Sequence, residues 1–559
     1  MFREIAKDKN FWKKVREDEG YKPLVDRLLE LYDEVGKEED IPALKFSEYK
    51  MFFETGNRMV YEKHYFYKRK RMNCFALLAL IYPEKEEYIV KLEDAIWSIC
   101  DEYNWVLPAH TKDYPMPDKR TVDLFSAETG YALSEITFLL KDRLSELIIN
   151  RVEEEVEERI INRFINNYQN WENNKANWAA VCAGSVAAAV MYNKPQVFSL
   201  VGERITSCME NFLEGYHDDG VCLEGIGYWE YGFGFFIWYA DMLKDFTDGE
   251  KDLFECEKIK QIATFAQKAY ITESCTVTFS DANPGTKIMV GMIHFLKTVY
   301  PDAISAIPLK SCKTDDHCGR WCHHVRSFTF FNPDYVNEGF ENDAEYFPVD
   351  SAWYIKKTPA YSFVIKGGNN DEPHNHNDVG SFILAKGDKQ LLADIGGGEY
   401  TKQYFNPETR YTILCNSSLG HSVPIINGKQ QEAGAEFSGK ISVEGGIVTV
   451  DMKDAYDEPS LKKLERRVEL CEHSLKITDS CEFENGGECV YRFVSFIEPE
   501  ILSDGLKIDE AIIKYNTASA NVKITEEKHT THIENEVIPV YLIDFKTDKG
   551  YIEFEIECE

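Results

Sequence analysis

The sequence predicts a multidomain protein of the α+β class, in which an all-helical N-terminal part is followed by an antiparallel β-sandwich. At 559 residues the chain is too long for a single hydrophobic core. Apolar residues recur at helical spacing from Glu4 to about Phe279. From about Val325 onward, short alternating segments separated by Gly, Asn and Asp turns take their place. The two patterns therefore indicate two domains.

About a dozen helices are expected in the first part. Segments with apolar residues at i, i+3 and i+4 and charges between them are residues 11–17, 21–35, 46–55, 61–82, 85–103, 122–138, 141–164, 178–192, 195–216, 228–245 and 254–270. The connectors are short and polar, which predicts successive antiparallel helix pairs. Such pairs either close into a ring or stack as a solenoid.

Short strands are expected in the second part. They include residues 325–331, 353–356, 361–366, 380–385, 446–452, 463–471, 474–482, 491–495, 522–524 and 540–545. Strands this numerous at such short spacing predict an antiparallel sandwich. We place the boundary between about residues 300 and 325, with a helical domain at 1–315 and a β-domain at 316–559. A ligand cleft is expected where the domains meet.

Charge and composition exclude several classes of partner. A formal net charge of −33 argues against a nucleic acid or an anionic membrane, because both attract basic surfaces. No apolar run has the length of a transmembrane helix, and the first residues lack the apolar core of a signal peptide, so a cytoplasmic protein is expected. The fifteen cysteines are then reduced thiols. The charge and composition remain compatible with a short anionic substrate in a locally basic cleft. They are also compatible with a homo-oligomer.

Three of the thirteen histidines lie between residues 374 and 421, in the stretch richest in Asn, Asp and Gly. His374 and His376 project the same way if the backbone is extended, so they can share one site. Asp394 follows a strand and precedes a glycine-rich turn, and His421 precedes a hairpin signal at 427–428. We predict that His376, Asp394 and His421 bind Zn²⁺. The alternative is a hydrogen-bonded cluster at the strand ends.

Two stretches of the helical part carry unusual residues. Asn174 and Asn177 precede a helix of small residues, where an Asn most often acts as an N-cap. Between Glu224 and Gly232, glycines stand on both sides of a group of aromatic residues that includes Tyr228. Aromatic residues near a helix start usually pack in the core, but the glycines suggest that the backbone here lies close to another group. A third cluster, Cys312 to His324, matches no common zinc spacing, so we interpret it as a connector with incidental thiols and keep a second metal site as the alternative.

Together these stretches resemble the heparinase II/III-like polysaccharide lyases. The matching motifs are Lys366-Gly367-Gly368, His374-Asn375-His376-Asn377-Asp378-Val379-Gly380-Ser381-Phe382, Asp394-Ile395-Gly396, Tyr400-Thr401, Arg410-Tyr411, Asn416-Ser417-Ser418, His421, Asn177-Trp178 and Glu224 with Tyr228. The resemblance implies an incomplete (α/α) toroid followed by a β-sandwich. It also implies β-elimination on uronic-acid-containing glycans, which leaves a 4,5-unsaturated uronate.

The resemblance also implies roles for individual residues. Tyr228 matches the catalytic tyrosine, His374 the catalytic histidine, and Asn177 the residue that neutralises the uronate carboxylate, with Asn174 near enough to contest that role. His376, Asp394 and His421 match the zinc ligands of some members. A glutamate of one branch is replaced by Ala180, so the specificity of that branch is not transferred. Further substrate contacts are expected from Asn174, Glu224, Trp229, Tyr404 and Arg410.

Two other functions stay open. A glycoside hydrolase on a similar scaffold needs a carboxylate pair across the cleft, for which Glu224 and Asp281 are the candidates. A non-catalytic glycan-binding protein needs no such pair. The expected partner is an anionic oligosaccharide or polysaccharide, and heparin-like, chondroitin-like, hyaluronan-like and alginate-like uronides all remain candidates.

Overall fold

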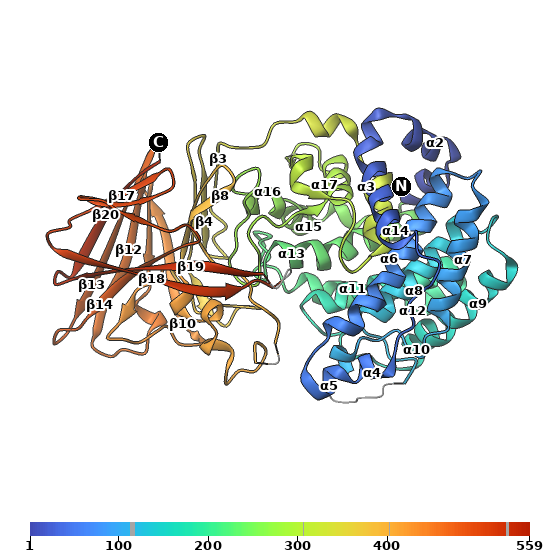
Figure 1. The fold of residues 1–559 in the computed structure, drawn as a ribbon, viewed down its shortest axis with the longest axis horizontal. Coiled ribbons are helices and arrows are strands. Elements are labelled where there is room, and N and C mark those ends of the chain that lie inside the picture. The colour runs from blue at the N-terminus through green and yellow to red at the C-terminus, as the bar shows by residue number, and fades with distance from the viewer. Residues whose placement is uncertain (112–117, 306, 402, 533–535, 559) are drawn as a thin grey trace.

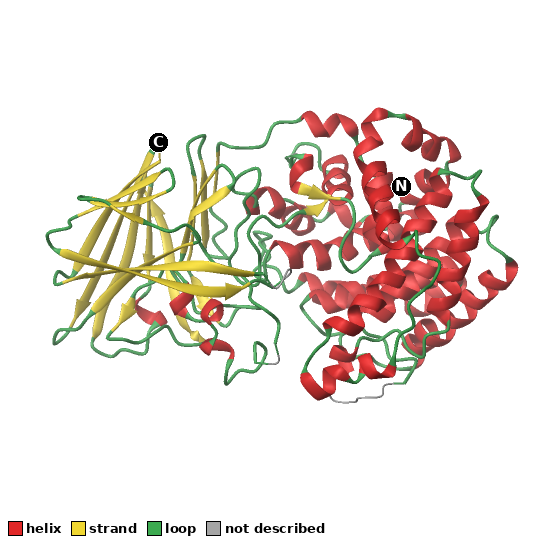
Figure 2. Ribbon diagram, in the orientation of Figure 1, coloured by secondary structure: helices red, strands yellow, loops and turns green. Residues whose placement is uncertain are grey.

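A helical domain and a β-domain lie side by side along the long axis of the molecule (Figures 1 and 2). The computed structural model describes residues 1–559 except 112–117, 306, 402, 533–535 and 559. The helices precede the large sheets in the chain, and the pairings within those sheets are antiparallel. The predicted order of a helical part followed by antiparallel strands is therefore confirmed.

The helical domain contains the segments expected from the 3.6-residue period. Its α-helices are α1 (Phe2–Lys7), α2 (Lys9–Glu17), α3 (Lys22–Val35), α4 (Phe46–Tyr49), α5 (Met51–Thr55), α6 (Met59–Ile81), α7 (Glu86–Cys100), α8 (Leu124–Leu139), α9 (Glu146–Val156), α10 (Asn162–Asn166), α11 (Asn177–Asn193), α12 (Phe198–Leu213), α13 (Ile226–Tyr228), α14 (Gly234–Phe246), α15 (Glu257–Ala263), α16 (Phe265–Ala269), α17 (Val290–Val299) and α18 (Trp321–Thr329). Two π-helical segments, Glu157–Ile161 and Trp229–Phe233, join α9 to α10 and α13 to α14. Among the described residues, none of these helices combines the length and apolar character needed to span a bilayer.

Helix α11 occupies the centre of this domain and begins at Asn177. It contacts α8, α12 and α14, and its run of small residues from Ala179 to Ala189 is buried. At Gly184 an added Cβ would stand 3.2 Å from the Phe235 carbonyl oxygen, so the small side chains let α14 approach closely. The first turn of α11 is thereby fixed relative to the segment that carries Tyr228.

Residues 325–331, expected to form a strand, instead belong largely to helix α18, and the helices continue beyond the predicted boundary at residue 315. The Arg326 guanidinium forms two hydrogen bonds of 2.9 Å with the carboxylate of Glu135 on α8, and both side chains are 0% exposed. Residues 321 to 331 are all buried. The helix is short, its polar residues such as His323 and Arg326 are buried with the apolar ones, and a short segment with few apolar residues does not distinguish a helix from a strand.

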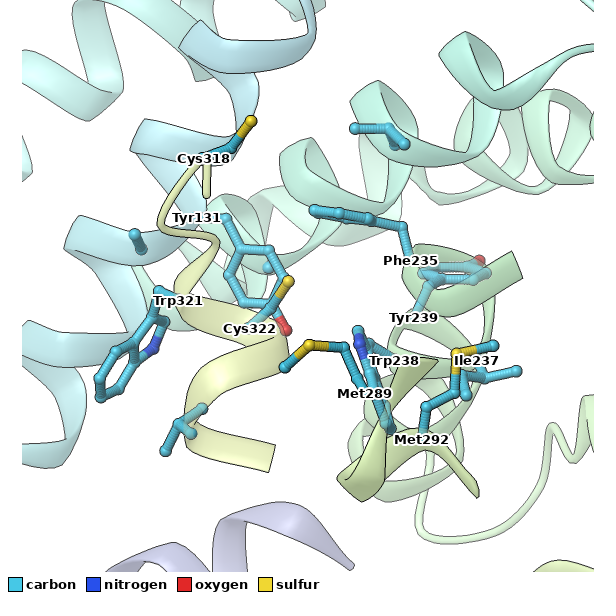
Figure 3. Close-up of a cluster of buried hydrophobic side chains, with 14 of the residues drawn as sticks. Tyr131, Phe235, Ile237, Trp238, Tyr239, Met289, Met292, Cys318, Trp321 and Cys322 are labelled. Atoms are coloured by element: carbon cyan, nitrogen blue, oxygen red, sulfur yellow. The ribbon is translucent and has the colours of Figure 1, made fainter. Parts of the chain in front are cut away.

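Buried aromatic and sulfur-containing side chains surround α18, as Figure 3 shows for Trp321, Cys322 and their neighbours. Burial raises the pKa of the Cys322 thiol well above its usual value. Among the described residues, the one group of His, Cys, Asp or Glu side chains close enough to hold a metal ion lies elsewhere. The thiols of the Cys312 to His324 cluster are therefore core residues of the helical domain.

The β-domain contains three sheets. The first has the order β15-β16-β17-β20-β13-β12-β11-β10-β6, the second β18-β19-β14-β9 and the third β3-β4-β5-β7-β8. The strands are β3 (Ala344–Tyr346), β4 (Trp353–Lys357), β5 (Ser362–Lys366), β6 (Gly368–Asn370), β7 (Phe382–Lys386), β8 (Lys389–Leu392), β9 (Ile425–Ile426), β10 (Gly434–Glu444), β11 (Ile447–Asp451), β12 (Leu461–Leu470), β13 (Ser474–Phe483), β14 (Cys489–Ser495), β15 (Glu500–Ile501), β16 (Gly505–Ile508), β17 (Ala511–Tyr515), β18 (Ala520–Thr530), β19 (Val537–Thr547) and β20 (Tyr551–Cys558). A two-stranded sheet, β1 (Ile288–Met289) with β2 (Cys312–Lys313), lies in the helical domain.

A buried arginine ties the sheets to the loops that carry the histidines. Arg466 on β12 pairs through two hydrogen bonds with Asp479 on β13, at 2.8 and 2.7 Å, and both side chains are 0% exposed. Its Nη1 also donates to the carbonyl oxygens of Gly380 and Ser422, at 2.8 and 2.6 Å. The loop that follows His376 and the loop that follows His421 are thereby held on one side chain.

The loop between α16 and α17 fastens the helical domain to the third sheet. Thr278 donates its hydroxyl to the Asp394 carbonyl oxygen at 2.8 Å, and the Gly397 amide donates to the Ala282 carbonyl oxygen at 2.9 Å. Gly396 has φ +67°, and a Cβ there would overlap the Ala282 carbonyl oxygen. Only glycine fits this left-handed position at such close approach.

We expect Gly396→Ala to destabilise the junction between the domains, because the added methyl group meets a backbone oxygen. Gly387→Ala is the matched control, since Gly387 also has a positive φ but has no atom within 4 Å of the added Cβ. The control loses about 1 kcal/mol through the backbone alone, and Gly396→Ala loses about 1–3 kcal/mol beyond that. Chemical denaturation measures both, and equal losses would contradict this account of the junction.

Candidate active site and metal site at the domain junction

The side chain of Asp281 is the point on which the candidate site converges. It comes from the helical domain and is 0% exposed. Its Oδ2 accepts hydrogen bonds from His374 Nδ1 at 2.5 Å and Tyr400 Oη at 2.8 Å. Its Oδ1 accepts from His376 Nε2 at 3.2 Å and from the Tyr404 hydroxyl. Burial opposes the charge of this carboxylate, but the hydrogen bonds from His374 and His376 hold the pKa of Asp281 well below its usual value.

His374 lies between Asp281 and the pocket described below. Its φ of +56° places it in a turn, so the extended backbone expected for this stretch is wrong. The expectation that His374 and His376 share a site is met through their common partner Asp281. Burial lowers the pKa of His374, but the hydrogen bond and charge of Asp281 more than offset it, so the pKa is raised. The free nitrogen, Nε2, lies 3.6 Å from Glu224 Oε2.

Tyr228 ends the short helix α13 and stacks near His374, with ring centroids 4.5 Å apart. Its hydroxyl lies 2.6 Å from the hydroxyl of Tyr400. Tyr400 uses its one proton to bond Asp281, so its oxygen accepts the proton of Tyr228. Burial, followed by the charge of Asp281, raises the pKa of Tyr228 well above its usual value. The Tyr228 hydroxyl is therefore neutral, and its lone pairs are free to face a ligand.

The glycines around Tyr228 bring its segment against the Asp281 loop, as the sequence suggested. Gly225 has φ +108°, and a Cβ there would lie 2.9 Å from Cβ of Ala282. A Cβ on Gly232 would lie 3.1 Å from Cβ of Asn177. These close approaches place Tyr228 between the start of α11 and the loop of Asp281.

One pocket is lined by Asn177, Glu224, Tyr228 and Pro373, together with Lys175, Phe212, Gly215, Tyr216, Cys222 and Leu223. It unites the two helical segments with the residue before His374, which lie far apart in the sequence. Asn174 is not among these residues, because its side-chain oxygen accepts the Ala176 amide proton at 2.6 Å and its side chain faces solvent. Of the two asparagines, Asn177 is the one that lines the pocket.

Two expected substrate contacts are corrected by the structure. Trp229 is 0% exposed and donates its indole proton to the Ile262 carbonyl oxygen at 2.8 Å, so it is a core residue. Tyr404 is 0% exposed and donates its hydroxyl proton to Asp281. Arg410 donates to the carbonyl oxygens of Tyr404 and Asn375, at 3.1 and 2.9 Å, and thereby braces the loops, while its side chain stays 12% exposed. Its contact with the substrate stays a prediction.

His376, Asp394 and His421 form a buried group whose ligand atoms all lie within 4.8 Å of one another. The side chains of all three are 0% exposed. His421 Nδ1 lies 2.8 Å from Asp394 Oδ2, and its Nε2 lies 2.7 Å from the Cys415 carbonyl oxygen. His376 Nδ1 is buried and has no hydrogen-bond partner among the described residues.

This arrangement suits a metal ion. Each imidazole directs one nitrogen to an oxygen acceptor, Asp281 for His376 and Cys415 for His421, which leaves the other nitrogen as a ligand. The unpartnered Nδ1 of His376 is accounted for if it binds a cation. Two imidazoles and a carboxylate form a donor set typical of Zn²⁺. The residues present therefore fit a metal.

Glu224 and Asp281 do not form the carboxylate pair that a glycoside hydrolase needs. Glu224 lines the pocket, but Asp281 is fully buried behind His374, and its oxygens accept from histidine and tyrosine side chains. Such a carboxylate is not positioned to activate water across a cleft.

The roles of Asp281 and Tyr400 were not predicted from the sequence. Tyr400 stood in a recognised motif, which was the available signal. Asp281 was noted only as a hydrolase candidate, because its partners lie 93 to 123 residues away along the chain.

Comparisons with known proteins identify relatives of the same fold. Residues 346–547 match the family model described as "Heparinase II/III-like, C-terminal". A crystal structure of heparinase III superposes with a TM-score of 0.63 at 14% identity, covering 90% of this chain and 77% of that one. The heparan sulfate lyase HepC from Pedobacter heparinus gives 0.60 at 11%, covering 98% and 92%. The chondroitin AC lyase of Streptomyces coelicolor A3, in complex with chondroitin sulphate, gives 0.57 at 8%, covering 100% and 82%.

No curated protein sequence matches the chain significantly. At these identities the superpositions establish a shared fold. Together with the family model, they confirm the resemblance to the heparinase II/III-like proteins.

We expect the purified protein to carry about one transition-metal ion per chain. Replacing His421 with Ala should lower the metal content and the melting temperature together, because a ligand that binds only the folded state stabilises it, by about 2.7 kcal/mol at 100 times its dissociation constant. His294→Ala, which removes a buried imidazole from the helical core, should lower stability but keep the metal. Elemental analysis measures the content, and a stable, metal-free protein would leave the hydrogen-bonded cluster as the correct interpretation.

Proposed function

We propose that the protein is a polysaccharide lyase that cleaves uronic-acid-containing glycans by β-elimination. The main support for this proposal is that Asn177, Tyr228 and Glu224 line one pocket, and that His374 lies next to Glu224 and Tyr228 at its edge. The fold likeness to heparinase III, a heparan sulfate lyase and a chondroitin AC lyase supports it. The same likeness supports an incomplete (α/α) toroid as the architecture of the helical domain, and an anionic oligosaccharide or polysaccharide as the substrate.

The first chemical requirement is to make the C5 proton of a uronate acidic. The negative charge of the carboxylate must be stabilised as more charge develops on it, and this needs a hydrogen-bond donor that is already positioned next to the carboxylate. Asn177 supplies an amide at the start of α11, where the backbone amides also present partial positive charge. Its position in the pocket suits it to bind the carboxylate in both the ground state and the transition state.

The second requirement is a base for that proton. The Tyr228 oxygen directs its own proton to Tyr400 and leaves its lone pairs free. As Tyr228 takes the C5 proton, its own proton passes to Tyr400 and the Tyr400 proton passes to Asp281. Asp281 can hold that proton because His374 gives its Nε2 proton to the leaving oxygen and so no longer stabilises the charged carboxylate. A neutral tyrosine can thus act as the base without ionising first.

The third requirement is an acid for the leaving oxygen at C4. Burial lowers the pKa of His374, but the hydrogen bond and charge of Asp281 raise it above its usual value, which favours the protonated imidazole. Its Nε2 proton is directed toward the pocket, near Glu224. His374 is therefore suited to donate a proton, and Tyr228 can return its own when proton and leaving group lie on one side of the ring.

Zn²⁺ is the metal we propose for His376, Asp394 and His421. When bound it supplies a fixed anchor for the loop of His374, two residues from a ligand, and not Lewis-acid chemistry.

The direct test is the ultraviolet absorbance of the new C4–C5 double bond on a panel of uronide oligosaccharides, with mass spectrometry of the products. Lyase products together have the mass of the substrate, whereas hydrolysis adds one water. Hydrolysed products, or no product from any uronide, would overturn the proposal.

Tyr228→Phe should abolish turnover while substrate affinity stays nearly unchanged, because the hydroxyl acts mainly in the transition state. Asn177→Ala is the contrasting variant and should impair both affinity and turnover, since the carboxylate is bound before the reaction too. Steady-state kinetics and calorimetry separate the two effects. A Tyr228→Phe enzyme with normal kcat and a raised KM would contradict the assigned role.

Asp281→Asn should lower kcat on the order of 10³- to 10⁴-fold, as expected when the carboxylate that orients a catalytic imidazole is lost. It should also weaken metal binding about 10- to 100-fold, because His376 loses its partner. Tyr404→Phe is the control, since it removes one donor to Asp281 and leaves both histidine contacts in place. Equal defects in the two variants would show that Asp281 acts only as a packing residue.

A further inference from the structure

One carboxylate oxygen of Glu224 accepts no hydrogen bond from any of the described residues. The residue is 9% exposed and lines the same pocket as Asn177 and Tyr228. Its Oε2 is buried and has no hydrogen-bond partner among the described residues; the nearest charged group is His374 Nε2 at 3.6 Å. A buried acceptor without a donor costs free energy. A donor that enters the pocket with a ligand removes that cost.

Lysine and arginine side chains are scarce around this oxygen. Among the described residues that line the pocket, the one Lys or Arg is Lys175, whose Nζ lies 3.1 Å from the carboxylate of Glu214 and whose side chain is 64% exposed. Arg410, behind the pocket, is engaged with two carbonyl oxygens. Sulfate esters are normally bound by arginine or lysine side chains, through charge-assisted hydrogen bonds. The pocket lining offers no such group next to Glu224.

We propose that Glu224 is a specificity-determining residue that accepts a hydrogen bond from a free hydroxyl of the sugar held between Asn177 and Tyr228. The pocket thereby selects uronides that carry no sulfate on that ring. The inference rests on the proposed function in one respect, namely that a uronate occupies this pocket.

The selection follows from what a sulfate ester does to the contact. Esterification removes the hydroxyl proton that Glu224 needs, and it brings a fixed negative charge toward a carboxylate in a region shielded from water. A site built around one sugar hydroxyl strongly rejects an analogue that cannot donate there. Burial raises the pKa of Glu224 while the charge of His374 opposes the shift. The carboxyl group accepts the hydroxyl proton in either protonation state, whereas the charge repulsion of a sulfate comes from the ionised form.

Binding measurements in the inactive Tyr228→Phe background test the inference apart from catalysis. The probes are tetrasaccharides of three backbones: glucuronate with N-acetylglucosamine, glucuronate with N-acetylgalactosamine, and mannuronate. Each is prepared without sulfate and with a sulfate ester on the uronate O2. For the backbone that binds, we expect at least about 100-fold tighter binding of the unsulfated member by calorimetry.

Glu224→Gln in the same background should reduce this preference to below about tenfold. Glutamine keeps an accepting carbonyl but removes the charge and adds a donor for the sulfate. Affinity for the unsulfated member should fall less than tenfold. Glu210→Gln is the matched control, because it removes one exposed carboxylate from α12, two residues from Phe212 in the pocket lining, and should keep the preference.

Equal affinity for the two members of each pair, or no binding of either, would overturn the inference. It would also be overturned if Glu224→Gln kept the preference, or if Glu210→Gln lost it equally, which would assign the selectivity to the overall charge. A preference that depends on Glu224, in a protein that yields no unsaturated product, would support the inference and refute the lyase proposal. The inference about Glu224 and the lyase proposal can therefore be refuted independently of each other.

Discussion

The structure of the site depends on one buried carboxylate. Asp281 belongs to the helical domain, whereas the two histidines and two tyrosines that donate to it belong to the β-domain. A carboxylate removed from water is tolerated only when donors surround it. Neither domain alone provides both partners, so the site forms only when the domains dock. The glycines at 225 and 396 serve the same end, because each allows the backbone to approach Ala282 beside Asp281.

This carboxylate also joins two groups that would otherwise be independent. One oxygen of Asp281 holds His376, a metal-site residue, and the other holds His374, which faces the pocket. Tyr400 extends the connection to Tyr228. The geometry of the pocket is therefore set by side chains behind it, and Tyr404 belongs to that supporting layer although the sequence suggested that it touches the substrate.

The fold was largely predictable because the spacing of apolar residues along the chain distinguishes amphipathic helices from alternating strands. Helix α18 is an exception, because it is short and fully buried, and so few residues do not show whether the apolar spacing is that of a helix or of a strand. Strand β20 was missed although Ile552, Phe554 and Ile556 alternate with glutamates. The histidines and Asp394 could be found because several chemically distinctive residues gather in one stretch. Asp281 could not, since a lone aspartate in a loop carries no local sign of partners about a hundred residues away.

The net negative charge of the chain does not prevent it from binding an anionic substrate, because most of the charges are far from the pocket and are screened. Exposed charges more than about 10 Å apart are largely screened at physiological salt, so a net charge of −33 acts mainly on approach. Affinity is decided inside the pocket. Behind the pocket, hydrogen bonds from His374 and His376 stabilise the charged carboxylate of Asp281, and Asp281 in turn raises the pKa of His374. Glu224 is the carboxylate of the pocket lining whose oxygen lacks a donor. The contact that discriminates between glycans is therefore a single local one, at Glu224.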